Sequence, residues 1–169
     1  MSIQDIDNRN LFSEIYEELS DSLYRHCFFR TSNAEIAEDL VQDVFMKFWR
    51  ELHLKGEIKY PKAWLYTALR NRIIDYYRKK KTLSLDVQLE NGFEPAGEHD
   101  HMHPETTAEI SILMKKIEML NDSDKEVIIM RYVDDLPIKE IAEIVQSNEN
   151  AVSVKLHRAV NKLKEQHDG

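Results

Sequence analysis

The stretch AEDLVQDVFMKFWR, residues 37–50, decides the fold of this chain, because its apolar residues recur at steps of three and four. That spacing places them along one side of an α-helix. With the flanking positions, the apolar side is formed by Ile36, Ala37, Leu40, Val41, Val44, Phe45, Phe48 and Leu52. The opposite side carries Glu38, Asp39, Gln42, Asp43 and Lys47. We therefore expect an amphipathic helix that packs on a core through one face and exposes a polar face.

One further helix is predicted on each side of this stretch. Residues 8–28 repeat the apolar spacing, and the side-chain oxygens of residues 31–33 can cap the helix that follows them. Lys55-Gly56 ends that helix. Pro61 suits the first turn of a third helix, which has the sequence PKAWLYTALRNRIIDYYRKKKT at residues 61–82 and ends in a basic run. Residues 1–81 are thus expected to form a three-helix domain.

The composition of the chain favours an all-α fold. Four Gly and four Pro in 169 residues leave few tight turns for a sheet fold. The single Cys27 cannot form an internal disulfide, and its helical spacing behind Leu19 and Leu23 places it in the expected core. No run of about 20 apolar residues could span a bilayer, and the first ten residues are polar and acidic. We therefore expect no membrane insertion and a cytoplasmic location.

Residues 82–103 predict a flexible acidic linker between two small helical domains. They lack helical periodicity and contain two glycines and one proline, Gly92, Pro95 and Gly97. Residues 82–108 hold six acidic residues and no Lys or Arg, against a formal net charge of −8 for the chain. A histidine-rich segment within the linker contains Glu98, His99, Asp100, His101 and His103. An unstructured segment makes a poor tetrahedral cage for zinc, so we expect no metal there.

Residues 104–169 are expected to form the second domain. Pro104 opens it, and an apolar stripe follows at Ile110, Leu113, Ile117 and Leu120. Ser123 and Glu126 have the spacing of a capping box for the next helix. The segment 137–145 and the final helix, from Glu149 to about Gln166, are separated only by the polar residues 146–148. Two helices joined by so short a turn favour a helix-turn-helix.

The final helix has two chemically different faces. At 100° per residue, its core face is formed by Val152, Leu156, Ala159, Val160 and Leu163. The opposite face shows Asn150, Ser153, Val154, His157, Arg158 and Asn161, flanked by Lys155 and Lys162. Amide and guanidinium groups match the hydrogen-bonding pattern of the DNA major groove, and an exposed valine can meet a thymine methyl. The alternative is a plain helical hairpin whose solvated face is polar.

The third helix of the first domain combines aromatic and basic residues. Five aromatic residues are interleaved with five basic ones over residues 59–78. The aromatic residues are Tyr60, Trp64, Tyr66, Tyr76 and Tyr77, and the basic residues are Lys59, Lys62, Arg70, Arg72 and Arg78. Aromatic rings stack on unpaired bases while cations follow the backbone, which is typical of single-strand binding. Trp64 and Tyr76 also fit the apolar stripe as core residues, whereas Arg70, Asn71 and Arg78 are expected to project outward. Lys79 to Lys81 also fit a solvated helix end.

Residues 37–50 and 61–82 resemble conserved region 2 of the extracytoplasmic-function (ECF) sigma factors of bacterial RNA polymerase, and residues 120–165 resemble their region 4. The resemblance implies a protein that binds core RNA polymerase and recognises promoters without being an enzyme. It implies polymerase docking by Asp39, Gln42, Asp43 and Lys47, on the clamp coiled coil of the largest subunit. It implies contact with the melted −10 element by the loop 54–62 and by Lys59, Lys62, Arg70, Asn71, Arg72, Arg78, Lys79 and Lys80.

In region 4 the resemblance implies that the exposed face of the last helix reads the −35 element. The residues concerned are Asn150, Ser153, Val154, Lys155, His157, Arg158 and Lys162. Further expected partners are the flap of the second polymerase subunit, promoter DNA and an anti-sigma factor, with no cofactor. Many relatives have basic residues at two or more of positions 153–155, where this chain has only Lys155. We therefore expect a different or weaker −35 preference.

Two other functions remain open from the sequence. The first is a free-standing helix-turn-helix regulator that binds duplex DNA as a dimer. The second is a protein-binding helical adaptor, which leaves the polar face of the last helix unexplained. An enzyme is disfavoured, since the sequence shows no nucleophile with its base, no glycine-rich phosphate loop and no paired carboxylates of the kind that catalysis requires.

Overall fold

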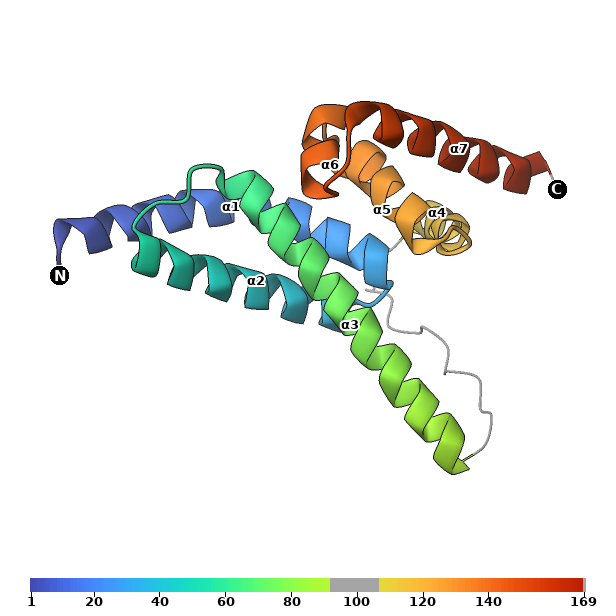
Figure 1. Cartoon of the computed structure of the whole chain (residues 1–169), viewed down its shortest axis with the longest axis horizontal. Coiled ribbons are helices and arrows are strands. Elements are labelled where there is room, and N and C mark those ends of the chain that lie inside the picture. Colours follow the sequence, from blue (N-terminus) through green and yellow to red (C-terminus); the bar gives the residue numbers. More distant parts are fainter. Residues whose placement is uncertain (92–106, 169) are drawn as a thin grey trace.

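The computed structural model describes residues 1–91 and 107–168, and within those ranges all the regular structure is helical (Figure 1). The helices are α1 (Ile3–Thr31), α2 (Ala34–Lys55), α3 (Pro61–Asn91), α4 (Ala108–Glu118), α5 (Asp122–Ile128), α6 (Ile138–Ile144) and α7 (Glu149–Asp168). A short π-helical turn, η1 (Ile129–Val133), continues α5. The predicted all-α fold is confirmed.

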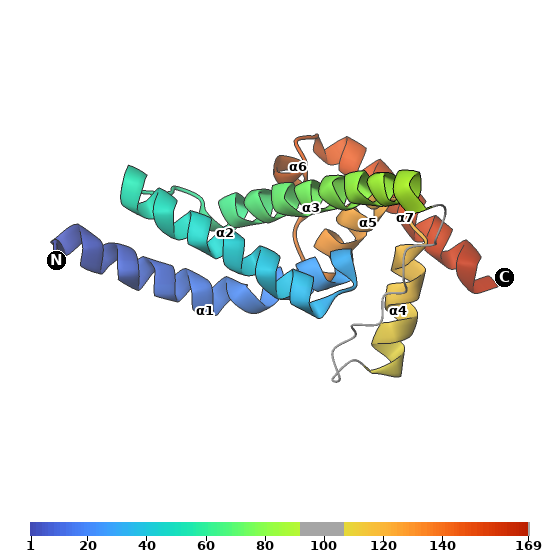
Figure 2. The same cartoon turned by 90° about the horizontal axis from the view of Figure 1, so that it is seen from below.

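Helices α1, α2 and α3 form the first domain. The first two run antiparallel, and α3 crosses them (Figures 1 and 2). Oδ1 of Asn33 accepts a hydrogen bond from the backbone N–H of Ile36 at 3.0 Å, which caps α2 as expected. Gly56 ends α2 with a φ of 73°, a conformation that glycine adopts without steric cost. The apolar face of α2 is buried, with Phe48 and Leu52 fully inaccessible.

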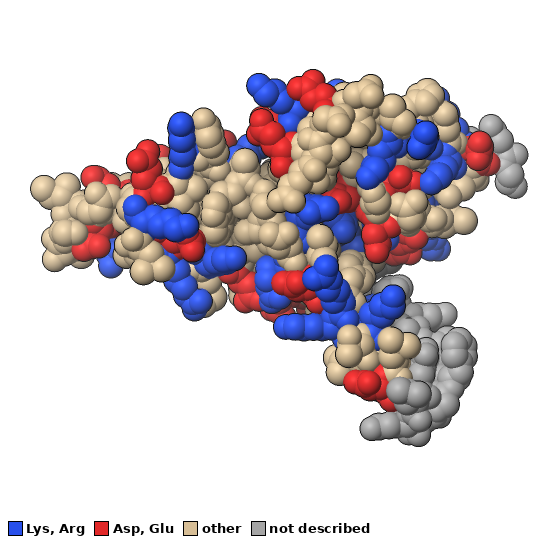
Figure 3. Space-filling view, viewed as in Figure 1, with Lys and Arg blue, Asp and Glu red and all other residues tan. Residues whose placement is uncertain are grey.

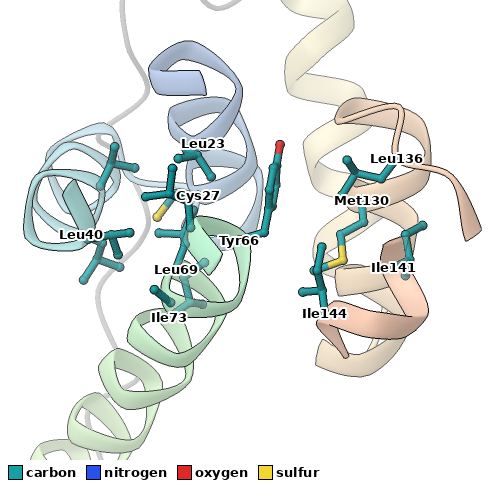
Figure 4. Close-up of a cluster of buried hydrophobic side chains, with 14 of the residues drawn as sticks. Leu23, Cys27, Leu40, Tyr66, Leu69, Ile73, Met130, Leu136, Ile141 and Ile144 are labelled. Atoms are coloured by element: carbon teal, nitrogen blue, oxygen red, sulfur yellow. The ribbon is translucent and has the colours of Figure 1, made fainter. Parts of the chain in front are cut away.

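The second domain consists of α4 to α7. Its buried apolar cluster includes Met130, Leu136, Ile141 and Ile144. In Figure 4 this cluster lies opposite that of the first domain, which includes Leu23, Cys27, Leu40, Leu69 and Ile73. The turn between α6 and α7 contains Gln146 at a φ of 56°, and Oδ1 of Asn148 accepts a hydrogen bond from the N–H of Ala151 at 2.8 Å. Gln146 and Asn148 thus form the short turn that the sequence predicted before the last helix.

Several boundaries differ from those predicted. Helix α1 begins at Ile3 instead of near Asn8, because Ser2 and Asp5 form a capping box. Helix α3 continues past Lys81 to Asn91, since no glycine or proline interrupts it before Gly92. Residues 82–91, which the sequence assigned to the linker, are therefore helical. The rest of the predicted linker, Pro104 and the histidine-rich segment lie outside the described residues.

The caps of the second domain also differ from the prediction. Helix α4 begins at Ala108 behind Thr107, whose hydroxyl accepts from the N–H of Ile110 at 3.3 Å. The capping residue of α5 is Asn121 and not Ser123, because Oδ1 of Asn121 accepts from the N–H of Asp124 at 2.8 Å. An Asn two positions earlier thus satisfies the end of the helix, and the predicted capping box does not form.

The two domains pack directly against each other, an arrangement that sequence periodicity did not predict. Nδ1 of His26 in α1 lies 2.6 Å from Oδ2 of Asp134, just after η1, and both side chains are almost completely inaccessible. The ring of Tyr66 meets that of His26 edge-on with centroids 5.7 Å apart. Burial raises the pKa of the Tyr66 hydroxyl well above its usual value. The boundary between the domains is therefore shielded from solvent at this point.

In the described ranges, every helix is too short or too polar to cross a lipid bilayer.

We expect Asp134→Ala to lower the free energy of unfolding by about 1–3 kcal/mol, because it leaves the buried imidazole of His26 without a partner. Urea denaturation followed by circular dichroism would measure the change. Glu143→Ala removes an exposed carboxylate of α6 and should change stability by about 0.5 kcal/mol at most. An equal effect of the two substitutions would contradict the role given to the His26–Asp134 pair.

Cys27 is fully inaccessible, and burial raises the pKa of its thiol from 9.0 to about 12. Because the thiolate is the reactive form, Ellman's reagent should react with the native chain very slowly at pH 8 and rapidly once the chain is unfolded in urea. Rapid reaction of the native chain, at a rate close to that of free cysteine, would contradict the burial of this side chain.

Candidate DNA and polymerase interfaces

Helix α7 presents the predicted base-reading face to solvent. Val152, Leu156 and Ala159 are buried, mainly against α5 and α6, and this fixes the rotation of the helix. The opposite side is exposed at all six predicted positions, Asn150, Ser153, Val154, His157, Arg158 and Asn161. Val154 is 41% exposed although it is aliphatic. The surface therefore combines hydrogen-bonding groups, one guanidinium and one apolar side chain, as major-groove reading requires.

The two lysines predicted to flank this face are engaged within the second domain. Nζ of Lys155 lies 2.5 Å from Oγ of Ser123, and Nζ of Lys162 lies 2.5 Å from Oδ2 of Asp124. Both contacts reach the first turn of α5. The side chain of Lys162 is 49% exposed, so its ammonium is available for exchange with a phosphate.

A hollow of about 530 Å³ lies between α2, the loop after it and the first half of α3. Its lining is Lys47, Glu51, Lys55, Ile58, Lys59, Tyr60, Ala63, Trp64, Thr67, Ala68 and Asn71. Trp64 is half-buried with its ring centroid 5.5 Å from that of Phe48, so it belongs to the core and also forms a wall of the hollow. Tyr60 is 67% exposed, and Nζ of Lys59 lies 5.4 Å from its ring centroid. An aromatic wall with an amide and lysines suits an unpaired base and its phosphates.

The arginines of α3 do not all point toward this hollow. Arg72 pairs with Asp43 of α2 at 2.5 Å. Arg70 was expected to project outward, but Nε of Arg70 donates to Oε1 of Glu126 in the second domain. Farther along the helix, Arg78, Lys79, Lys80 and Lys81 are exposed. Figure 3 shows Lys and Arg side chains gathered on this part of α3.

The polar face of α2 is exposed as predicted, at Asp39, Gln42, Asp43 and Lys47. An apolar groove of about 600 Å³ lies beside it, between α1 and α2. The groove is lined by Arg9, Phe12, Ser13, Tyr16, Gln42, Phe45, Met46, Trp49 and Arg50. Helical periodicity alone did not predict this groove. Met46, an apolar residue on the polar side of α2 and 55% exposed, was the signal that could have revealed it.

Within the described ranges, no three metal-ligating side chains come together. The histidine-rich segment lies outside those ranges, so its predicted lack of a metal stays a prediction.

Comparison with known proteins identifies both domains. Residues 15–82 match the family model of sigma-70 region 2, and residues 110–163 match that of sigma-70 region 4. The chain is 30% identical over 152 residues to the ECF RNA polymerase sigma factor SigM of Bacillus subtilis, an alignment that covers 89% of this chain and 91% of SigM. It is 26% identical over 160 residues to the ECF sigma factor BldN of Streptomyces coelicolor, covering 90% of this chain but only 58% of BldN.

A solved structure has the same fold. The sigma factor RpoE of Bartonella quintana, crystallised in complex with the anti-sigma factor NepR, superposes with a TM-score of 0.72 at 25% sequence identity. The superposition covers 91% of this chain and 94% of that one.

Proposed function

Since this chain belongs to the ECF family of RNA polymerase sigma factors, we propose that its two domains divide promoter recognition between them while core RNA polymerase carries out catalysis. The chain is an alternative sigma factor that directs promoter recognition and transcription initiation. Because it acts with the polymerase, its place is the cytoplasm, and its own contribution is recognition without a cofactor. The observation that carries the proposal is the exposed polar face of α7 on a helix-turn-helix.

We assign the −35 element to the exposed face of α7. Ser153, Val154, His157 and Arg158 would contact base edges in the major groove, with Asn150 near the start of the helix. Lys155 and Lys162 would exchange their present partners on α5 for phosphates. This division follows the general rule that base contacts specify and phosphate contacts position.

The melted −10 element is assigned to the hollow between α2 and α3. Tyr60, Trp64 and Asn71 provide a stacking surface and an amide for an extruded base. Lys59, Lys62, Arg78, Lys79 and Lys80 would follow the backbone of the single strand. Arg70 and Arg72 remain candidates for the same backbone after release from their present carboxylate partners.

The exposed face of α2 is proposed as the docking surface for the clamp coiled coil of the largest polymerase subunit. Asp39, Gln42, Asp43 and Lys47 supply its polar part. Met46 and the apolar groove beside Gln42 supply area that can be buried on docking. The second domain would contact the flap of the second subunit. An anti-sigma factor, such as the one bound in the RpoE structure, is the expected regulator.

Co-elution with bacterial core RNA polymerase, followed by run-off transcription from a promoter library, tests this function. Stable association together with new sequence-selective transcripts is the expected result. The formal net charge of −8 predicts weak binding to DNA by the free chain and tight binding only in the holoenzyme. Failure to bind core polymerase, together with dimeric binding to duplex DNA, would favour a free-standing helix-turn-helix regulator instead.

Arg158→Ala should weaken recognition of the −35 element by about ten- to a hundredfold, since it removes the one guanidinium on the exposed face of α7. Transcription from promoters with intact and scrambled −35 elements would measure this loss of discrimination, with core binding unchanged. Lys115→Ala removes an exposed cation from α4 and serves as the control. Full discrimination in Arg158→Ala would remove this residue from the reading face.

Asp39→Lys should lower the affinity for core polymerase by about tenfold or more, because it reverses a charge on the proposed docking surface. Asp39 is preferable to Asp43, whose substitution would also release Arg72. Competition for core polymerase against the unmodified chain gives the affinity, and Glu14→Lys on α1 is the charge-matched control. If Asp39→Lys competes as well as Glu14→Lys, the docking surface lies elsewhere.

A further inference from the structure

The pairs between the two domains all have the same direction in the described residues. In each of them the basic side chain belongs to the first domain and the carboxylate to the second. The pairs are His26 with Asp134, Arg30 with Glu126, Arg70 with Glu126 and Lys62 with Glu140. Nζ of Lys62 lies 3.2 Å from Oε2 of Glu140, and Nη1 of Arg30 lies 3.6 Å from Oε1 of Glu126. The ion pairs of Arg30, Arg70 and Lys62, together with the hydrogen bond between His26 and Asp134, therefore link the domains at several separate points.

Two of these basic residues, Arg70 and Lys62, belong to the set that we assign to the backbone of the −10 strand. Their partners in the second domain are carboxylates, which offer cations the same kind of anionic oxygen acceptor as a phosphate does. In the pair of Arg70 with Glu126 the side chains are 24% and 9% exposed, so most of the Arg70 side chain is withheld from DNA while the domains are closed. The pair between Lys62 and Glu140 is more open, at 48% and 42%.

The closed arrangement engages two cations of the proposed −10 surface and leaves the exposed face of α7 free. The reading face of α7 is exposed throughout, whereas Arg70 is engaged beneath the second domain. A crevice of about 670 Å³ lies between the start of α3 and α6, beside Lys62. Its charged lining is Lys59 and Lys62 from the first domain and Lys139, Glu140 and Glu143 from α6. The interface is thus incomplete on the side where a nucleic-acid strand would approach Lys62.

We propose that Glu126 and Glu140 substitute for DNA phosphates in the free chain, holding Arg70 and Lys62 in a closed form that binds single-stranded DNA weakly. The inference rests on the proposed function, because it assumes that these cations serve the −10 strand. Separation of the domains releases both cations at once. The −10 surface then becomes complete only when the second domain has moved away.

The test measures binding of the full chain to a fluorescein-labelled single-stranded oligonucleotide by anisotropy, without polymerase. Glu126→Gln and Glu140→Gln each remove one carboxylate and keep a side chain of similar size. We expect affinity to rise by about three- to tenfold for Glu126→Gln and by a smaller factor for Glu140→Gln. Glu109→Gln on the exposed side of α4 makes the same change in net charge and should leave affinity unchanged. Small-angle scattering should show a larger radius of gyration for Glu126→Gln than for Glu109→Gln.

An affinity gain in Glu126→Gln no greater than that in Glu109→Gln would overturn the proposal. Arg30 is buried beside Glu126, so Glu126→Gln could fail to fold, which circular dichroism would detect. In that case Glu140→Gln decides, since its pair is exposed, and the absence of any gain there overturns the proposal.

Transcription by the wild-type chain with core polymerase distinguishes failure of the closed form from failure of the proposed function. If the wild type directs transcription and the variants gain no affinity, only the closed form is wrong, whereas failure of the wild type to bind core polymerase contradicts the proposed function.

Discussion

Burial of the apolar face of α2 is the constraint on which the first domain depends. Leu40, Val44, Phe48 and Leu52 are nearly or completely inaccessible between α1 and α3, so the rotation of α2 about its axis cannot change without exposing them. Each buried aliphatic or aromatic side chain contributes about 1.5–3 kcal/mol relative to exposure. The same rotation turns Asp39, Gln42 and Asp43 outward. The proposed docking surface is therefore a direct consequence of how the core is packed.

The second domain uses the same principle on shorter helices. Helix α6 has only seven residues and would be marginal alone, but Ile141, Ala142 and Ile144 are buried against its neighbours. Val152 and Leu156 anchor α7 to the same cluster. Because α7 carries its polar residues opposite to these anchors, the proposed reading face is accessible while the helix is held by the core. Rigid presentation on a helix limits the entropy lost when DNA binds.

Local patterns in the sequence predicted the features that depend on local periodicity. The helical spacing gave the faces of α2 and α7 correctly, and Asn33, Gly56 and Pro61 marked true helix ends. The predicted end of α3 was wrong. Polar composition alone does not end a helix, and no glycine or proline stands between Lys81 and Gly92. Asn121 and Ser123 are both good capping residues, and the spacing to Glu126 favoured the wrong one. Glu126 was unavailable for a capping box because it turns toward Arg30 and Arg70.

Contacts between the domains could not be predicted in this way, because their partners are distant in sequence. His26 and Asp134 are 108 residues apart, and Arg70 and Glu126 are 56 apart. Nothing in the local pattern around Arg70 distinguishes a cation that faces solvent from one that meets a carboxylate of another domain. The chemistry of this interface nevertheless has a consequence for its opening. An apolar interface could separate only by exposing its surface to water, whereas an ion pair can separate when another anion replaces the carboxylate. Since DNA is such an anion, the pairs that Arg70 and Lys62 form with carboxylates can hold in the free chain and still give way to a promoter.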